Sequence, residues 1–266
     1  MTGSLALVRK AKIPMPFTLS HPAMAAPFWP LVRRQHLPLC ALVIGTMAPD
    51  FEYLWRLQIE WRWSHTLLGV FYFCLPIGLL ALGVWVGLLR TPTRRLFAMP
   101  PAPLSIAGRW WILAALAIVL GALTHIAWDG FTHGFGWATN FWPGLRRTVR
   151  FGNFAVPVYN LLQLLSTAIG GLVVLAWLVQ EVRRGEPRAL GAAWRIAVVA
   201  LMGTLAALLA VWNARRVGPA SDYWTMDIQL GRAAVGALLG VVVGLVAYSG
   251  LHRWIATGAA SQAESR

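Results

Sequence analysis

Charged residues are scarce in this sequence, and acidic ones most of all. Only 12% of the 266 residues are charged, against about a quarter in a typical soluble domain. Nine residues are Asp or Glu, while 58% are hydrophobic. This composition argues against a soluble fold and favours an integral membrane protein.

Cysteine is nearly absent as well. Cys40 and Cys74 lie in apolar runs without the paired spacing of a disulfide framework or a zinc knuckle, so we expect them to pack in the core. The N-terminus lacks the basic, apolar and cleavage-site order of a signal peptide, and no cleaved export signal is expected. Met15 is an alternative start, which makes residues 1–14 an N-terminal extension.

The excess of basic residues does not indicate a nucleic-acid partner. The net charge is +14, but the basic residues fall between apolar runs instead of gathering in one patch or along one helix. We therefore expect no nucleic acid and assign this charge to orientation in the lipid bilayer.

Long apolar runs predict an all-α fold, a polytopic integral membrane bundle of about 5–7 transmembrane helices, because one spanning helix needs about 20 apolar residues. Residues 37–49 are apolar but short, so they either span the bilayer or dip into it. Residues 17–32 are rich in proline and form the weakest candidate. Five segments have sufficient length: 66–89, 110–131, 154–180, 191–212 and 230–251.

Arginines cluster at alternate span ends, around residues 33–34, 90–109 and 183–195. The positive-inside rule then puts the loops 50–65, 132–153 and 213–229 outside, although the arginines of 146–150 do not fit this placement. We expect multi-pass insertion in a lipid bilayer. The chain divides into the extension 1–14, a membrane core 15–180 that bears His and Asp, and C-terminal transmembrane helices with a short tail, 181–266.

Small residues repeat in the last predicted span. Gly236, Gly240 and Gly244 recur at four-residue intervals, which leaves one helix face without side chains and allows another helix to approach closely. The pattern predicts packing, either within the chain or by helix–helix self-association between chains.

The rare ionisable residues fall in three short stretches, around His21, around Asp50 and Glu52 with His65 nearby, and from His125 to His133. Ionisable groups at membrane depth are costly, so each is a candidate functional residue.

The third stretch carries the clearest spacing. Four-residue steps place His125 and Asp129 on one face of a helix, and His133 joins them if the helix continues past Gly130. Neutral imidazole and carboxylate both suit zinc, manganese or iron, so the pair predicts half of a metal site. The alternative is a network of hydrogen-bonded polar groups that holds helices together.

The predicted topology brings most candidates to one membrane face, namely Asp50, Glu52, His65, Asp129 and His133. His21 reaches that face only if residues 17–32 also enter the membrane. Further along the chain, four polar residues either line the same cavity or satisfy one another at a helix end: Asn153, Tyr159, Asn160 and Gln163.

Hydroxyl residues precede the four histidines of the three stretches, as in Ser64-His65 and Thr124-His125. We expect Ser64 to cap a helix that begins at His65. The other hydroxyls are candidates for orienting the rings.

Four runs, MPFTLSHPA, IGTMAPDFEYLW, WSHTLLGVFYFCLPIGLL and HIAWDGFTH, resemble the bacterial membrane family catalogued as domain of unknown function 4184, over roughly residues 15–180. More loosely, the order of His and Asp motifs is similar to that of the predicted membrane-bound metal-dependent hydrolases. Glu52 stands where the hydrolase pattern has a second aspartate, and Glu60 where it has a histidine.

The hydrolase resemblance implies a divalent metal ion, such as zinc or manganese, and nominates ligands among His21, Asp50, His65, His125 and Asp129. His133 is a further candidate ligand, and Glu52 the candidate general base. The substrate expected for such an interfacial site is a phosphoester or another ester of a lipid, with the arginines of 146–150 near a phosphate head group. The likeness to the bacterial family implies multi-pass insertion in the bacterial cytoplasmic (inner) membrane. Two non-enzymatic alternatives stay open: a transporter or proton relay, and a structural protein with a polar core.

Overall fold

The computed structural model describes residues 18–34, 36–58, 62–100, 107–151, 154–185, 191–219 and 223–264. The predicted extension 1–14, Glu60 and Asn153 lie outside these residues. In chain order the elements are η1 Thr18–Phe28, α1 Trp29–Arg33, α2 Leu39–Met47, η2 Ala48–Asp50, α3 Phe51–Arg56, α4 Leu67–Gly69, η3 Val70–Cys74, α5 Leu75–Val84, η4 Trp85–Leu89, α6 Arg90–Leu96, α7 Gly108–Thr132, α8 Trp137–Phe141, η5 Pro143–Arg146, β1 Thr148–Phe151, β2 Phe154–Pro157, α9 Val158–Arg183, α10 Ala192–Arg215 and α11 Tyr223–Glu264. Here η1, η2 and η5 are 3-10 helices, and η3 and η4 are π-helical stretches within the run from α4 to α6.

Among the described residues, five helical stretches are long and apolar enough to cross a membrane: Leu67–Leu96, Gly108–Phe141, Val158–Arg183, Ala192–Arg215 and Ile228–Ile255. They overlap the five secure predicted spans, which confirms the all-α polytopic membrane fold. The two weaker candidates form no such stretch. The nine-residue α2 is only about 14 Å long at 1.5 Å per residue, and residues 18–33 are divided between a 3-10 helix and one short α-helix.

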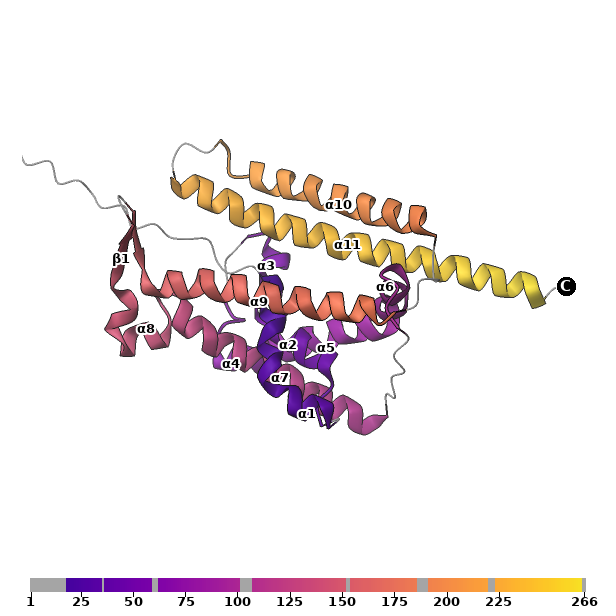
Figure 1. Ribbon diagram of the computed structural model, residues 1–266, viewed down its shortest axis with the longest axis horizontal. Coiled ribbons are helices and arrows are strands. Elements are labelled where there is room, and N and C mark those ends of the chain that lie inside the picture. The colour runs from indigo at the N-terminus through magenta and orange to yellow at the C-terminus, as the bar shows by residue number, and fades with distance from the viewer. Residues whose placement is uncertain are drawn as a thin grey trace, which may run out of the picture.

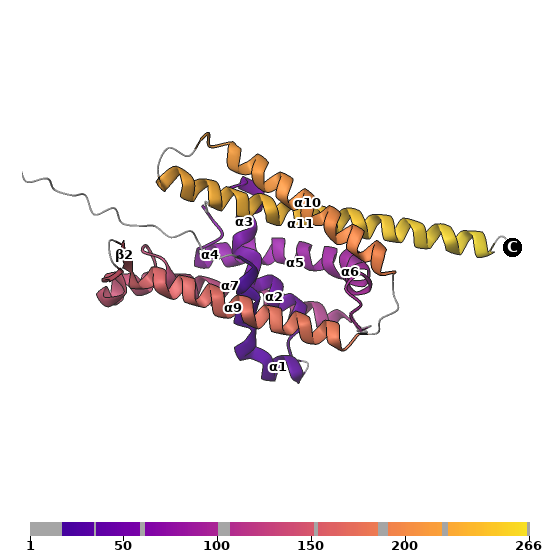
Figure 2. The same cartoon turned by 45° about the horizontal axis from the view of Figure 1, so that its top comes forward.

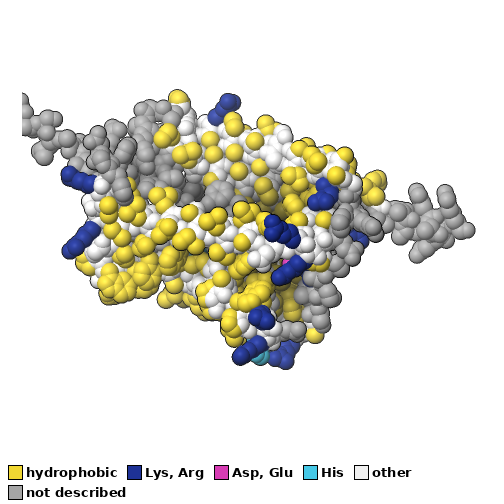
Figure 3. Space-filling view, viewed as in Figure 1, with side chains coloured by type: hydrophobic (Ala, Val, Ile, Leu, Met, Phe, Trp, Pro, Cys, Tyr) yellow, Lys and Arg dark blue, Asp and Glu magenta, His cyan; other side chains and the backbone are white. Residues whose placement is uncertain are grey.

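The helices form two groups that differ in direction. Figures 1 and 2 show α10 and α11 lying alongside each other on one side of the molecule, while the N-terminal segment from η1 to α2 crosses the direction of α9. Hydrophobic side chains cover most of the described surface in Figure 3, with cations scattered among them. Such a surface suits contact with lipid.

Contacts at the helix ends confirm that the chain alternates between two ends of the bundle. Arg94 and Glu181 form an ion pair of 2.7 Å, and Arg195 Nε donates to the carbonyl oxygen of Leu96 at 2.8 Å. At the other end, Asn213 Nδ2 donates to the carbonyl oxygen of Leu57 at 2.9 Å. The side of the membrane that each end faces stays a prediction.

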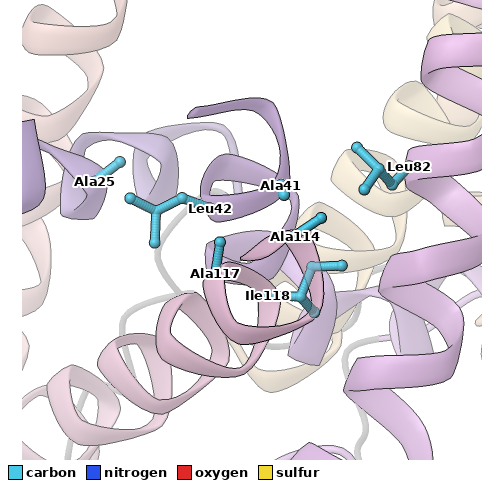
Figure 4. Close-up of a cluster of buried hydrophobic side chains, with 7 residues drawn as sticks. All are labelled: Ala25, Ala41, Leu42, Leu82, Ala114, Ala117 and Ile118. Carbon is cyan, nitrogen blue, oxygen red and sulfur yellow. The ribbon is translucent and has the colours of Figure 1, made fainter. Parts of the chain in front are cut away.

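The central core lies where α2 crosses α7. Its buried side chains are mostly small, which brings the two backbones together; Figure 4 shows Ala25, Ala41, Leu42, Leu82, Ala114, Ala117 and Ile118. Gly45 and Gly121 face each other's helix at the crossing. A Cβ atom added to Gly121 would lie 2.5 Å from the Leu42 carbonyl oxygen, so only glycine allows this approach.

The glycine repeat of the last span packs within the chain. Cβ atoms added to Gly236, Gly240 and Gly244 would all collide with α10, at Leu209, Ala206 and Met202. The structure thus shows one of the two packing modes that the repeat allows. Self-association through this face stays a prediction, and the face is already covered by α10.

The only strands in the described part of the chain form a two-stranded antiparallel hairpin, in which Val149 pairs with Val156. The hairpin, α8 and the beginning of α9 lie at the same end of the molecule (Figure 1).

Candidate metal centre

Asp50 owes its position to the end of α2. Ala48 and Pro49 follow this helix, and the chain tightens there into the 3-10 turn η2, which ends at Asp50. The side chain is 5% exposed. It lies next to α7 because the glycines at the crossing let α2 approach so closely.

His125 and Asp129 occupy the same face of α7, as their spacing predicts. Nε2 of His125 is 3.2 Å from Oδ2 of Asp129 and 3.5 Å from Oδ1 of Asp50. His65, in the turn before α4, completes the arrangement. Its Nε2 lies 3.5 Å from the same two oxygens, Oδ1 of Asp50 and Oδ2 of Asp129.

These four atoms form a closed ring in which imidazole nitrogens alternate with carboxylate oxygens. All four sides of the ring measure 3.2–3.5 Å. A tetrahedral ion with bonds of 2.0–2.2 Å holds its ligand atoms about 3.3–3.6 Å apart. The sides of the ring match these separations, and the donor atoms of Asp50, His65 and His125 all lie within 4.8 Å of one another, so these three residues fit the ligand shell of one divalent ion.

The hydrogen bonding of His125 strengthens this interpretation. Its Nδ1 lies 2.7 Å from the backbone carbonyl oxygen of Thr46, and because a carbonyl only accepts, Nδ1 carries the proton. In the neutral ring Nε2 then presents a lone pair to the carboxylates of Asp50 and Asp129. This buried nitrogen has no hydrogen-bond partner among the described residues. Three acceptors facing one another require a cation between them, either a metal ion or a second proton on His125.

His65 is oriented by its neighbour Ser64. Ser64 Oγ lies 2.9 Å from Nδ1 of His65, which leaves Nε2 to face the carboxylates. The predicted capping role of Ser64 is wrong: α4 begins at Leu67, and its cap is Thr66, whose hydroxyl accepts from the Gly69 backbone N–H at 2.9 Å. A preceding hydroxyl orients the imidazole of His65, as expected. It does not do so at His125, because Thr124 Oγ1 donates to the Gly121 carbonyl instead.

His21 lies at the same centre, which resolves the conflict in its predicted position. Its ring stacks on His125, with centroids 4.1 Å apart and planes 16° apart, and its Nδ1 is 3.8 Å from Oδ2 of Asp50. Since α2 is too short to span, η1 and Asp50 need not lie on opposite sides of the membrane. His21, His125 and Asp129 also offer donor atoms within 4.8 Å of one another.

His133 lies at the edge of the cluster. Its Nδ1 is 3.7 Å from Oδ1 of Asp129, and its Nε2 is 3.4 Å from Nε2 of the buried Gln163. It is absent from both sets of described residues whose donor atoms lie within 4.8 Å of one another. Asn160 and Gln163, two of the predicted cavity residues, are buried at the beginning of α9.

Glu52 is bonded differently from the ligand candidates. Its buried carboxylate accepts from Nε of Arg56 at 2.7 Å and from the backbone N–H groups of Arg62, Trp63 and Ser64 at 3.0–3.2 Å. Burial alone would raise the pKa of this carboxyl. The hydrogen bonds lower it by more, so that the pKa is about 2. Glu52 thus fixes the turn that presents His65. The predicted role of Glu52 as general base stays a prediction.

Tyr53 is a residue of this site that the sequence did not reveal. Its hydroxyl oxygen lies 3.4 Å from Nε2 of His65, and its ring stacks on that of His65. Burial raises the pKa of Tyr53 well above its ordinary value, and the negative charges of Asp50, Asp129 and Glu52 raise it further, so the hydroxyl keeps its proton. A tyrosine in an apolar sequence is typical of core packing. No sequence signal distinguishes Tyr53 from such a residue.

The charge of Asp50 follows from its neighbours. Burial raises its pKa, but the neighbouring imidazoles of His125, His65 and His21 lower it more, so that the pKa lies below its ordinary value. A charged carboxylate at this position is the form that ligates a cation.

Fold and site together define a helical membrane protein with a buried His/Asp centre. The model of the family described as a domain of unknown function (DUF4184) matches residues 15–250, and the chain belongs to this family. The match extends beyond the predicted stretch 15–180, through α10 and most of α11. No curated protein and no solved structure matches the chain.

Proposed function

We propose that this protein is a membrane-embedded metal-dependent hydrolase whose divalent ion, zinc or manganese, is held by Asp50, His65, His125 and Asp129. The observation that carries the proposal is the closed ring of two nitrogens and two carboxylate oxygens, with sides of 3.2–3.5 Å. The similarity of its motifs to those of the predicted membrane-bound metal-dependent hydrolases supports the same conclusion.

A divalent ion at the ring would supply Lewis acidity and, with a coordination position left open for water, would lower the pKa of that water to about 7. In hydrolysis of a phosphoester, the water oxygen bonds to phosphorus, the bond to the leaving oxygen breaks, and that oxygen takes up the proton. The residues around the ring prepare the centre. Thr46 fixes the tautomer of His125, Ser64 and the Glu52-bound turn orient His65, and the Tyr53 ring stacks on the imidazole of His65.

The location of the cluster favours a hydrolase over a transport pathway. A pathway needs polar groups along the whole depth of the membrane. Here His125, Asp129 and His133 occupy the C-terminal end of α7, and Asn160 and Gln163 the first turns of α9, at one end of both helices. We therefore infer an ester of a membrane lipid as the substrate class, since such a bond lies at the membrane surface.

The test is hydrolysis by the full-length protein in phosphatidylcholine vesicles that contain phosphatidic acid or phosphatidylglycerol, supplied with Zn²⁺ or Mn²⁺. Release of phosphate, head group or fatty acid is measured. We expect release by the wild type and by His36→Ala, an exposed histidine outside the cluster, and none by His125→Ala or after chelation. Metal-loaded wild type that releases none of these products contradicts the proposed hydrolase.

A further inference from the structure

A second feature lies beside the centre, in the segment from Gly134 to Pro157. This segment contains α8, η5 and the β1–β2 hairpin, and it connects the end of α7 to α9. No Asp or Glu occurs in the sequence between Asp129 and Glu181, while Arg146, Arg147 and Arg150 all fall there. The three arginine side chains are exposed, and none forms an ion pair with a described residue.

Exposed aromatic side chains accompany these arginines. Trp137, Phe141 and Trp142 are exposed, Phe141 at 75%. Trp137 and Trp142 also pack against Phe131 of α7, with ring centroids 5.1 and 5.7 Å away. Aromatic rings with one apolar and one wet side are typical of the zone between lipid tails and head groups. The rings thus form a packed, partly exposed aromatic surface of the kind that suits the head-group zone.

The segment is fixed to the site by hydrogen bonds. Thr139 Oγ1 donates to the carbonyl oxygens of His133 and Gly136, at 3.2 and 2.8 Å. Arg146 donates to the carbonyl oxygen of Gly134 at 3.2 Å and also bonds Asn140. Arg147 and Arg150 have no side-chain hydrogen bond to a described residue that would hold them back from the surface.

We propose that the segment 134–157 binds the phosphate of anionic phospholipids in the surrounding bilayer, through Arg147 and Arg150, with Trp137, Phe141 and Trp142 inserted between the lipids. The charge of the segment matches this partner, since three cations without a nearby carboxylate attract an anionic head group, and guanidinium pairs with phosphate in a bidentate manner. The exposed aromatic rings select a lipid over a free anion. This surface does not depend on metal at the ring, so the two proposals fail separately.

The experiment is native mass spectrometry of the full-length protein in detergent with equimolar phosphatidylglycerol and phosphatidylcholine. We expect wild type to bind phosphatidylglycerol in preference to phosphatidylcholine. In R147Q/R150Q the ratio of bound phosphatidylglycerol to bound phosphatidylcholine should be at least about fivefold lower. The matched control R33Q/R183Q removes two exposed arginines without side-chain bonds to described residues, and should keep it. R147K/R150K should retain part of the preference, because the charge remains while the bidentate pairing is lost.

Three results would overturn the proposal. They are an unchanged preference in R147Q/R150Q, an equal loss in R33Q/R183Q, and displacement of phosphatidylglycerol by an equimolar amount of inorganic phosphate. The last would identify a free anion as the occupant. The glutamine variant should elute and melt like wild type, because both side chains are exposed and neither forms a side-chain hydrogen bond or ion pair with a described residue.

Discussion

The N-terminal half of the bundle and the α10–α11 pair are built in opposite ways. The half that carries the centre uses short, interrupted helices: α2 has nine residues, η2 is a 3-10 turn, and α3 ends at Leu57 in a left-handed conformation. In contrast, α10 and α11 are continuous over 24 and 42 residues. Each break redirects the chain, so Asp50 and His65 approach α7 from separate directions. Among the described residues, the continuous pair contributes no member of the His/Asp centre, and its glycines pack α11 against α10.

The largest effects are expected where glycines let two helices approach closely, at the α2–α7 crossing and between α10 and α11. Gly121→Leu should push α2 away from α7, remove the His125–Thr46 hydrogen bond, and cost roughly 1–3 kcal/mol or more of stability. Gly240→Leu should separate α11 from α10 at similar cost but leave the centre intact. Thermal unfolding and metal content measured on the same samples distinguish the two.

A matched control exists in α9, where nothing lies within 4 Å of a Cβ atom added to Gly171. Gly171→Leu should therefore change neither the melting temperature nor the metal content by much. If Gly121→Leu retains wild-type metal content, the crossing does not position the centre.

A smaller effect is expected at Glu52, and it separates two roles of this residue. Glu52→Gln weakens the four hydrogen bonds that hold the His65 turn, so metal affinity should fall about 10- to 100-fold, as for other residues that position ligands. Competition with a chelator measures this affinity. Glu181→Gln, which breaks the Arg94 ion pair at the far end, should leave it unchanged. Unchanged affinity in Glu52→Gln together with lost turnover would instead support the general-base role.

The smallest effect concerns the hydroxyls that precede the histidines. Ser64→Ala removes the contact to Nδ1 of His65 and should weaken metal binding by up to about tenfold. Thr124→Ala removes a hydroxyl at the equivalent position before His125, but that hydroxyl bonds a backbone carbonyl, so binding should not change. Equal effects in the same titration would show that neither hydroxyl acts through its histidine.

The sequence predicted the spans and the ligand candidates for clear physical reasons. Apolar runs of sufficient length have one stable form in a bilayer, and the four-residue step from His125 to Asp129 places both on one helix face whatever surrounds them. The cost of ionisable groups near the membrane identified Asp50 and His65 as well.

What the sequence could not predict depends on tertiary geometry. The Thr46 carbonyl that orients His125 is a backbone group with no sequence signature. The sequence does not distinguish Glu52 from a ligand carboxylate. Only its hydrogen bonds to the backbone of residues 62–64 show that it holds a turn. His21 was ambiguous because composition alone does not show that α2 is too short to cross the membrane.

The most direct test of the central claim is the metal content of freshly purified, never-chelated full-length protein, by inductively coupled plasma mass spectrometry. The account predicts about one equivalent of zinc or manganese in wild type and in His36→Ala. It predicts less than about a tenth of that in His125→Ala and Asp129→Ala, because each loses one corner of the ring. Wild-type protein without stoichiometric metal would contradict the account and leave a protonated His125 between two carboxylates as the cation of the site.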